Sequence, residues 1–347
     1  MINFYCPLGQ GPNGGHKVIY HSVEALNLLG INAQVLHPLA KYRIKSFHSK
    51  AKVNTQKKIK SSDYFIIPEV CLSFFDEQEI SKYSKYSILV QNGYLFLGSE
   101  NPMNSIKSIY ENSDFIFCVS QDTAEVILLL FPNLSDKIVL FEPSMERFIS
   151  ESIDSSKKKN ITYMPRKNYN YSNIVVNLLS SKLPKKWKII TIDGQSENQV
   201  IELLKNSSIF LSFSGLEGNP APPLEAAVLG NIVIGNHGNG AKSYWNEPLF
   251  INVSQDDLKS YVIKTLELVK KMDLKQGVDE NYENSRLDLI NSLKERLTLS
   301  TVIANLVNSK EIVGTVLKGE REHFYSVSLF WYSSWRIKTR LKNLFYK

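Results

Sequence analysis

The residues best suited to chemistry lie in one stretch, which reads SSIFLSFSGLEGNPAPPLEAAVLGNIVIGNHGNGAKSYW. Its apolar run Ile209–Phe213 predicts a buried strand. A helix is expected to start at Pro222 or Pro223, because proline lacks the N–H that has no partner in a first helical turn. Glu217 then lies in the connecting loop and Glu225 in the first helical turn. Both carboxylates are therefore expected at the carboxyl edge of a parallel strand.

The expected chemistry of this edge follows from its charges. A helix amino terminus offers free N–H groups and a positive dipole end, which attract phosphate. The carboxylates of Glu217 and Glu225 repel phosphate but accept hydrogen bonds from sugar hydroxyls. The combination is typical of a site for a phosphate-linked sugar. The alternative interpretation is a dipole-stabilising Glu225 and a solvent-exposed Glu217.

The spacing of the two glutamates, E-x7-E within EGNPAPPLEAAVLGNIVIG, resembles the signature of retaining, nucleotide-sugar-dependent glycosyltransferases of the two-Rossmann-domain (GT-B) type, the family 4-like or group 1 enzymes. The flanking strand, the Pro-Pro, the Gly230 turn and the glycine turn Gly238–Gly240 agree with it. The resemblance implies a sugar transfer that retains configuration, without metal or cofactor, and with the leaving phosphate assisting the acceptor hydroxyl.

The resemblance also implies roles for individual residues. Glu217 would contact the donor sugar, and Arg166 and Lys167 would neutralise the departing diphosphate, for which cations are suited. The expected donor-binding residues are Gly14, Gly15, Gly194, Ser196, Gly218, Asn219 and Glu225, of which Glu225 would bind the ribose. An ordinary solvated strand end is the alternative for Arg166 and Lys167.

The sequence departs from the family pattern at three places. Asn219-Pro220 replaces a Phe-Gly, which removes one backbone N–H from the donor side. Arg166 and Lys167 are adjacent, so only one would point at phosphate if both lay in a strand. The family's histidine of the first domain is missing from Val90–Tyr94, which offers Gln91 and Asn92 to the acceptor, together with His16 after the first strand. For His16, a surface position at a helix start is the alternative.

The elements that must position these residues alternate between strands and helices. In the first part the expected strands are Ile2–Cys6, Asn32–Leu36, Tyr64–Ile67, Ser87–Gln91 and Phe115–Val119, and the expected helices are Lys17–Leu29 and Thr123–Phe131. A second alternation follows Ile161 and ends with one helix over Tyr282–Ala304. The pattern predicts an α/β fold of two Rossmann-like, doubly wound parallel sheets that face a cleft.

The predicted domains are residues 1–145, an acceptor-side layer, and 161–316, the nucleotide-sugar-binding layer, with a polar linker over 146–160. Residues 317–347 are expected to form a basic, aromatic, helical tail that packs on the first domain or on a membrane surface. The chain has 347 residues, 41 Lys and Arg, 34 Asp and Glu, and 3 Cys. This composition excludes a disordered chain and a disulfide framework, and favours a cytoplasmic protein without a secretion signal or membrane span.

The net charge of +7 is concentrated in two segments. Lys41–Lys60 carries eight Lys and Arg and no acid, and Lys318–Lys347 carries seven against two glutamates. Aromatic residues interleave with the cations of the second segment, which favours attachment to an anionic inner membrane face. Packing of the tail on the first domain is the alternative, and no nucleic-acid-binding motif accompanies the cations.

The expected partners are a nucleotide sugar and a glycan or lipid-linked glycan acceptor, and the expected process is bacterial surface polysaccharide assembly, as lipopolysaccharide O-antigen or capsule. Three alternatives remain on sequence grounds. A sugar-nucleotide epimerase or a phosphorylase can use the same two-layer fold, and Asn219-Pro220 favours a non-catalytic nucleotide-sugar-binding subunit. The nucleotide base, the sugar, the linkage and the acceptor are left open.

Overall fold

The computed structural model describes residues 1–9, 13–55, 58–60, 62–72, 75, 84–95, 103–153, 158–274, 280–312 and 324–326. The chain divides into two compact units. Unit 1 comprises Met1–Val119, Thr123–Pro143 and the described part of Leu297–Lys347; unit 2 comprises Ser120–Asp122 and Ser144–Arg296. Each unit has its own parallel sheet and its own core.

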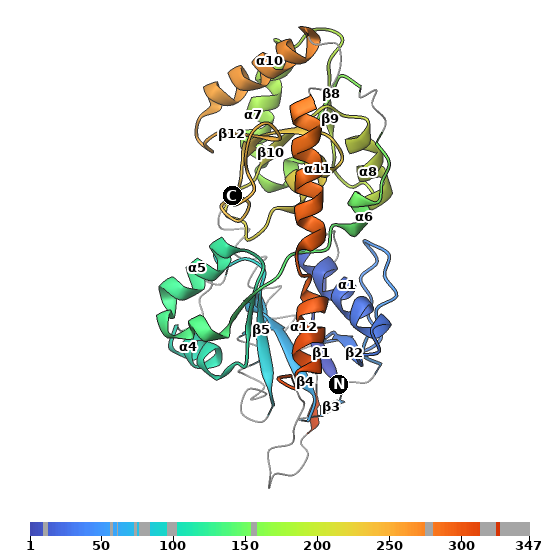
Figure 1. Cartoon of the computed structure of the whole chain (residues 1–347), viewed down its shortest axis with the longest axis vertical. Coiled ribbons are helices and arrows are strands. Elements are labelled where there is room, and N and C mark those ends of the chain that lie inside the picture. Colours follow the sequence, from blue (N-terminus) through green and yellow to red (C-terminus); the bar gives the residue numbers. More distant parts are fainter. Residues whose placement is uncertain are drawn as a thin grey trace. The chain divides into compact units, whose positions relative to one another are not determined.

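Unit 1 is built on a parallel sheet of six strands among the described residues (Figure 1). The strands, in sheet order, are β2 (Ala33–Leu36), β1 (Ile2–Tyr5), β4 (Tyr64–Pro68), β5 (Tyr86–Val90), β6 (Ile116–Cys118) and β7 (Ile138–Leu140). The helical segments are α1 (Gly14–Leu28), η1 (Glu69–Cys71), α4 (Met103–Asn112), α5 (Gln121–Leu130), η3 (Pro132–Lys137) and α12 (Leu299–Asn308).

Both faces of this sheet are covered, which explains why its strands are continuous apolar runs. In β4, Tyr64 and Ile66 belong to one core cluster, together with α1 and α12, whereas Phe65 and Ile67 belong to the other, together with Ile106 of α4. Successive strand residues point to opposite faces, so a strand buried on both sides needs apolar residues at every position. The five predicted strands of this part all coincide with observed ones.

Unit 2 repeats the design with a parallel sheet of five strands in its described residues. In sheet order these are β12 (Phe250–Asn252), β11 (Ile232–Asn236), β10 (Ile209–Phe213), β8 (Asn160–Tyr163) and β9 (Lys188–Thr191). The helical segments are α6 (Glu146–Ile149), η4 (Pro165–Lys167), α7 (Tyr169–Ser180), α8 (Glu197–Lys205), α9 (Ala221–Val228), α10 (Leu258–Leu274) and α11 (Glu280–Glu295). The predicted fold class, two doubly wound parallel layers, matches this architecture.

The single helix expected over Tyr282–Ala304 is two helices, α11 in unit 2 and α12 in unit 1. Thr298 ends the continuity, because its side chain accepts the N–H of Thr301 as the N-cap of α12. α12 packs against α1, and Val302 and Ile303 lie in the core of unit 1. The chain therefore returns to unit 1 at Leu297, which differs from the predicted second domain over 161–316.

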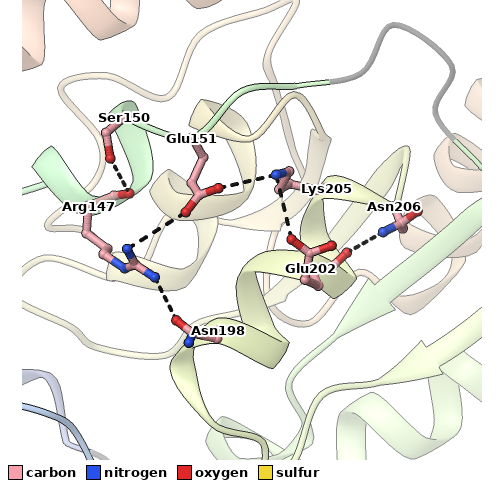
Figure 2. Close-up of polar contacts among 7 residues, drawn as sticks. All are labelled: Arg147, Ser150, Glu151, Asn198, Glu202, Lys205 and Asn206. Carbon is pink, nitrogen blue, oxygen red and sulfur yellow. Dashed lines mark hydrogen bonds and ion pairs between the residues drawn. The ribbon is translucent and has the colours of Figure 1, made fainter.

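The first residues of the linker expected over 146–160 are instead a folded part of unit 2. Figure 2 shows α6 and the residues after it bound to α8. Arg147 donates to Asn198 Oδ1 over 2.6 Å, and Lys205 Nζ lies 3.2 Å from a Glu151 carboxylate oxygen. Phe148 joins the core of the unit. Residues 154–157 lie outside the described part.

The two basic segments meet at one backbone ladder of unit 1. Strand β3 (Lys58–Lys60) pairs antiparallel with β13 (Phe324–Ser326), with Phe324 opposite Lys60. Residues 327–347, which carry most of the predicted helical tail, lie outside the described residues. Within the described residues, no helix is long and apolar enough to cross a membrane.

Candidate active site

The strand order of unit 2 defines where its ligand is expected. From β8 the chain moves outward to β9 and then crosses back to β10 on the other side of β8. Open parallel sheets bind ligands at such a reversal, outside the carboxyl ends of the strands. Lys167 follows β8, and Glu217 follows β10. Both line one pocket with Met164, Ser214 and Pro222.

Lys167 and Glu217 form an ion pair in this pocket. Lys167 Nζ donates to Glu217 Oε2 over 2.7 Å. The Glu217 side chain is 14% exposed, and its Oε1 is buried without a hydrogen-bond partner among the described residues. A buried oxygen without a partner costs free energy, which a ligand hydroxyl can recover. The pair thus presents one cation and one accepting oxygen to the pocket.

A glycine turn after β11 holds the backbone of Glu217. The N–H of Glu217 donates to the Gly238 carbonyl over 2.9 Å, and the N–H of Gly240 donates to the Glu217 carbonyl over 3.1 Å. A Cβ at Gly240 would overlap the carbonyl oxygen of Gly218, and Gly238 has a φ of +63°. Glycine is required here for close approach and for a left-handed backbone.

The helix after Glu217 begins one residue before the earlier of its two predicted starts, Pro222. α9 begins at Ala221 with Pro220 as its N-cap, so Glu225 lies in the second turn and the first turn holds no acidic residue. Glu225 remains half-buried. Asn219, which stands where the family pattern has phenylalanine, accepts a hydrogen bond from the Tyr244 hydroxyl over 3.3 Å at Oδ1. That bond orients the Asn219 side chain toward Tyr244 within unit 2.

The expected cation pair adopts a different backbone from the predicted one. Arg166 and Lys167 lie in the 3₁₀ turn η4, so the rule that neighbouring strand residues face opposite ways does not apply to them. Lys167 contacts Glu217, whereas Arg166 is exposed and has no ion pair among the described residues. Of the two cations, Arg166 is therefore the one without a carboxylate partner in the described structure.

The loop after β9 contains Gly194 and Ser196, two of the expected donor-binding residues. Gly194 has a φ of +75°, which glycine adopts at low cost. Ser196 caps α8 in a capping box with Gln199. Gln195 Oε1 is buried without a hydrogen-bond partner in the described structure. Contact of Gly194 and Ser196 with a donor stays a prediction.

The expected acceptor-side residues His16, Gln91 and Asn92 lie in unit 1 beside Gly14 and Gly15, which are expected to bind the donor. Its chain runs from β1 to β2 and then crosses to β4, so the reversal lies between β1 and β4. Gly14, Gly15 and His16 start α1 after β1, where Asn13 accepts the Gly15 N–H over 2.8 Å. Gln91, after β5, donates from Nε2 to the Gly15 carbonyl over 3.4 Å, and a Cβ at Gly15 would lie 3.1 Å from Gln91 Oε1.

His16 is not the surface residue of the alternative interpretation. Its side chain is 7% exposed, and its Nδ1 has no hydrogen-bond partner among the described residues. A Cβ at Gly9 would overlap the imidazole, so Gly9 packs directly on the ring. Burial lowers the pKa of His16, which favours the neutral ring.

Sequence reasoning missed one residue at this edge, Glu69. It follows β4 directly and accepts the N–H of Asn92. Its signal in the sequence was a carboxylate placed immediately after the apolar run Tyr64–Pro68, where the carboxyl end of a buried strand was already predicted.

Comparisons with known proteins agree with this architecture. No family model matches the chain. The α-1,6-glucosyltransferase of Actinobacillus pleuropneumoniae serotype 7 (strain AP76) is 25% identical to it over 248 residues, which are 68% of this chain and 72% of that protein.

The similar solved structures extend over most of the chain at low identity. Sucrose-phosphate synthase from Thermosynechococcus elongatus has a TM-score of 0.65 at 10% identity, covering 89% of this chain and 98% of that one. The lipopolysaccharide outer core galactosyltransferase WaaB has a TM-score of 0.53 at 14% identity, covering 90% and 99%. An α-glucosyltransferase in complex with UDP has a TM-score of 0.54 at 13% identity, covering 89% and 98%. With its two doubly wound units, the chain has the GT-B fold of glycosyltransferases.

Proposed function

We propose that the chain is a retaining, metal-independent glycosyltransferase that moves a sugar from a nucleotide sugar to a glycan or lipid-linked glycan during assembly of a bacterial surface polysaccharide. The observation that carries this proposal is the Lys167–Glu217 pair at the reversal of the unit 2 sheet. It supplies a cation for a diphosphate and a carboxylate oxygen for a sugar hydroxyl. The names of the similar proteins, a glucosyltransferase and a lipopolysaccharide galactosyltransferase, support the same class.

On the donor side, each group has a separate task. Arg166 and Lys167 neutralise the charge that develops on the leaving phosphate when the bond to the anomeric carbon breaks. The N–H groups at the start of α9 add a positive dipole end. Glu217 binds a donor-sugar hydroxyl through Oε1, Glu225 binds the ribose, and Gly194 and Ser196 flank the base.

On the acceptor side, His16, Gln91 and Asn92 bind hydroxyls. The acceptor oxygen bonds to the anomeric carbon on the face that the phosphate leaves, so configuration is retained, and the acceptor proton passes to the departing phosphate oxygen. Gln91 and Asn92 orient the acceptor, because an amide cannot serve as a general base near neutral pH.

The decisive experiment is a screen of UDP-, GDP-, dTDP- and CMP-sugars with octyl glycosides as acceptors. We expect one nucleotide to raise the unfolding midpoint in proportion to the logarithm of its concentration. We also expect its sugar to appear on the acceptor with retained configuration, at a rate that EDTA leaves unchanged. Epimerisation of the donor sugar without transfer would indicate an epimerase. Release of sugar that depends on inorganic phosphate would indicate a phosphorylase. Tight binding without transfer or hydrolysis would indicate a binding subunit.

We also propose that unit 1 attaches to an anionic membrane through the two basic segments. The β3–β13 ladder brings the start of the tail beside Lys58–Lys60, and Lys45, Lys50 and Lys52 are exposed. Each Lys or Arg near an anionic surface contributes about 1 kcal/mol.

The test of attachment is sedimentation with vesicles of phosphatidylglycerol and phosphatidylethanolamine. A chain shortened after Val327 keeps the β3–β13 ladder and removes the aromatic, basic tail. We expect the full chain to sediment at low salt and the shortened chain to stay largely in the supernatant. Equal sedimentation of both would remove the tail from the proposal. Pure phosphatidylcholine vesicles, which lack net charge, are the control.

A further inference from the structure

Glu69 is a carboxylate inside the core of unit 1, at the reversal of its sheet. It follows β4, one of the two strands that flank the reversal, and starts the short helix η1. The residue is 3% exposed. Glutamate is rarely buried to this extent without a charged partner. No ion pair to Glu69 is present among the described residues, so its retention in the core needs another explanation.

The carboxylate holds the turn that follows β5. Glu69 Oε1 accepts the N–H of Asn92 over 3.0 Å, and the backbone N–H of Gln91 also donates to this carboxylate. Within the turn, Asn92 Oδ1 accepts the N–H of Tyr94 over 3.0 Å. Glu69 thus holds the backbone of the two residues that are expected to meet the acceptor.

The turn is also fixed from two other sides. Gln91 reaches the backbone of Gly15 at the start of α1, and a Cβ at Gly93 would lie 3.3 Å from Val126 of α5. Apart from these two contacts, the backbone of the turn is held by the hydrogen bonds from the Gln91 and Asn92 N–H groups to Glu69. A change at Glu69 would be transmitted directly to the side chains of Gln91 and Asn92.

This arrangement costs stability. Glu69 Oε2 is buried without a hydrogen-bond partner in the described residues. The titratable groups that face the carboxylate from neighbouring elements are Cys71 of η1, Tyr110 of α4 and Cys118 of β6, and none of these three is a cation. Burial accordingly raises the pKa of the Glu69 carboxyl from 4.5 to about 7, although the backbone N–H groups oppose the rise.

We propose that Glu69 is a positioning residue for the acceptor: its carboxylate fixes the turn of Gln91 and Asn92 against Gly15 at the carboxyl edge of the unit 1 sheet. This inference rests on the proposed function and names the group that orders its acceptor side. A carboxylate accepts backbone N–H groups more strongly than a neutral carboxyl does. Ionised Glu69 therefore orders the turn at the expense of folding free energy.

The first test compares Glu69→Gln with the wild type by chemical unfolding between pH 4.5 and pH 8. Because the folded-state pKa is raised, the Glu69 carboxyl contributes fully to the free energy of unfolding below about pH 4.5. This contribution declines as the pH rises to about 7. Across that range the unfolding equilibrium constant should increase by up to about two orders of magnitude. Glu69→Gln should lack this increase. At pH 8 its unfolding midpoint should lie at a higher denaturant concentration than that of the wild type. Cys118→Ala, in the same core with the carboxyl intact, should keep the increase.

The second test measures the turn itself by hydrogen exchange of the Gln91 and Asn92 amides, which needs no substrate. In Glu69→Gln at pH 8 both should exchange at least about fivefold faster than in the wild type, whereas amides of β10 in unit 2 should not change. Unchanged exchange at both positions would overturn the proposal, whether or not the chain transfers sugar. If the wild type transfers no sugar, only the proposed function fails.

The third test separates positioning from a purely structural role. With the nucleotide sugar and octyl glycoside selected by the screen, Glu69→Gln should lower acceptor kcat/KM at least about tenfold while the nucleotide Kd stays within about twofold. Wild-type acceptor kcat/KM should increase with pH through about 7, and that of Glu69→Gln should be flat. A more stable variant with wild-type kcat/KM and pH profile would make Glu69 structural only and overturn the proposal.

Discussion

Glu217→Gln should lower sugar transfer by at least about 100-fold and leave the nucleoside diphosphate bound as tightly as in the wild type, or more tightly. Glutamine keeps the size of the side chain but not the charge that holds Lys167 at 2.7 Å. Lys167 is then free to bind phosphate before any donor arrives. The donor-sugar hydroxyl, in turn, loses the carboxylate that accepts its hydrogen bond. Initial rates and calorimetric titration with the nucleotide selected by the screen measure the two effects separately.

Glu225→Ala is the comparison for this variant. Glu225 lies in the second turn of α9, outside the Lys167–Glu217 pair, and its expected role is ribose binding. We therefore expect Glu225→Ala to weaken nucleotide binding, with a smaller loss of kcat at saturating donor. Turnover of Glu217→Gln close to that of the wild type would refute the assignment of Glu217 as the donor-sugar contact.

Gly240→Ala should have the second large effect, although residue 240 is not expected to touch substrate. A Cβ there would overlap the carbonyl oxygen of Gly218, so the turn and the Glu217 loop must separate. Overpacking of this kind costs about 1–3 kcal/mol of stability, and displacement of a positioned group by about 1 Å can cost about 100-fold in rate. We expect a lower unfolding midpoint together with a loss of transfer comparable to that of Glu217→Gln.

Gly215→Ala is the matched control for folding, because it lies in the same loop and a Cβ there would meet no atom within 4 Å. Its unfolding midpoint should stay close to that of the wild type in thermal denaturation. Should Gly240→Ala keep both its midpoint and its transfer rate, the glycine turn does not hold Glu217 in place.

The sheets were predictable because their strands are buried on both faces. The expected strand Ile209–Phe213 coincides with β10, since a strand covered by helices on both sides requires an uninterrupted apolar run. The glycine turn was also visible, but its task was not. The sequence shows that Gly238 and Gly240 permit an unusual backbone, whereas only the structure shows that this backbone holds Glu217.

What could not be predicted depends on contacts distant in sequence. The helical periodicity of Tyr282–Ala304 continues through a change of unit, because both α11 and α12 present apolar residues to a core. The pairing of Lys167 with Glu217 joins residues fifty positions apart, and no local pattern encodes it. Glu69 was overlooked because a carboxylate at a strand end is ordinarily solvated, and its burial arises from α4, β5 and β6 together.

The return of α12 to unit 1 has a consequence for the order in which the chain acquires structure during its synthesis. Apart from Ser120–Asp122, unit 2 is one continuous segment, Ser144–Arg296, so nearly all of its contacts are available once that segment has left the ribosome. Unit 1 cannot complete its core at that stage. Its core around α1 includes Leu299, Val302 and Ile303, which are synthesised after unit 2. The part synthesised first is therefore expected to finish folding second, with its apolar α1 face exposed while unit 2 matures.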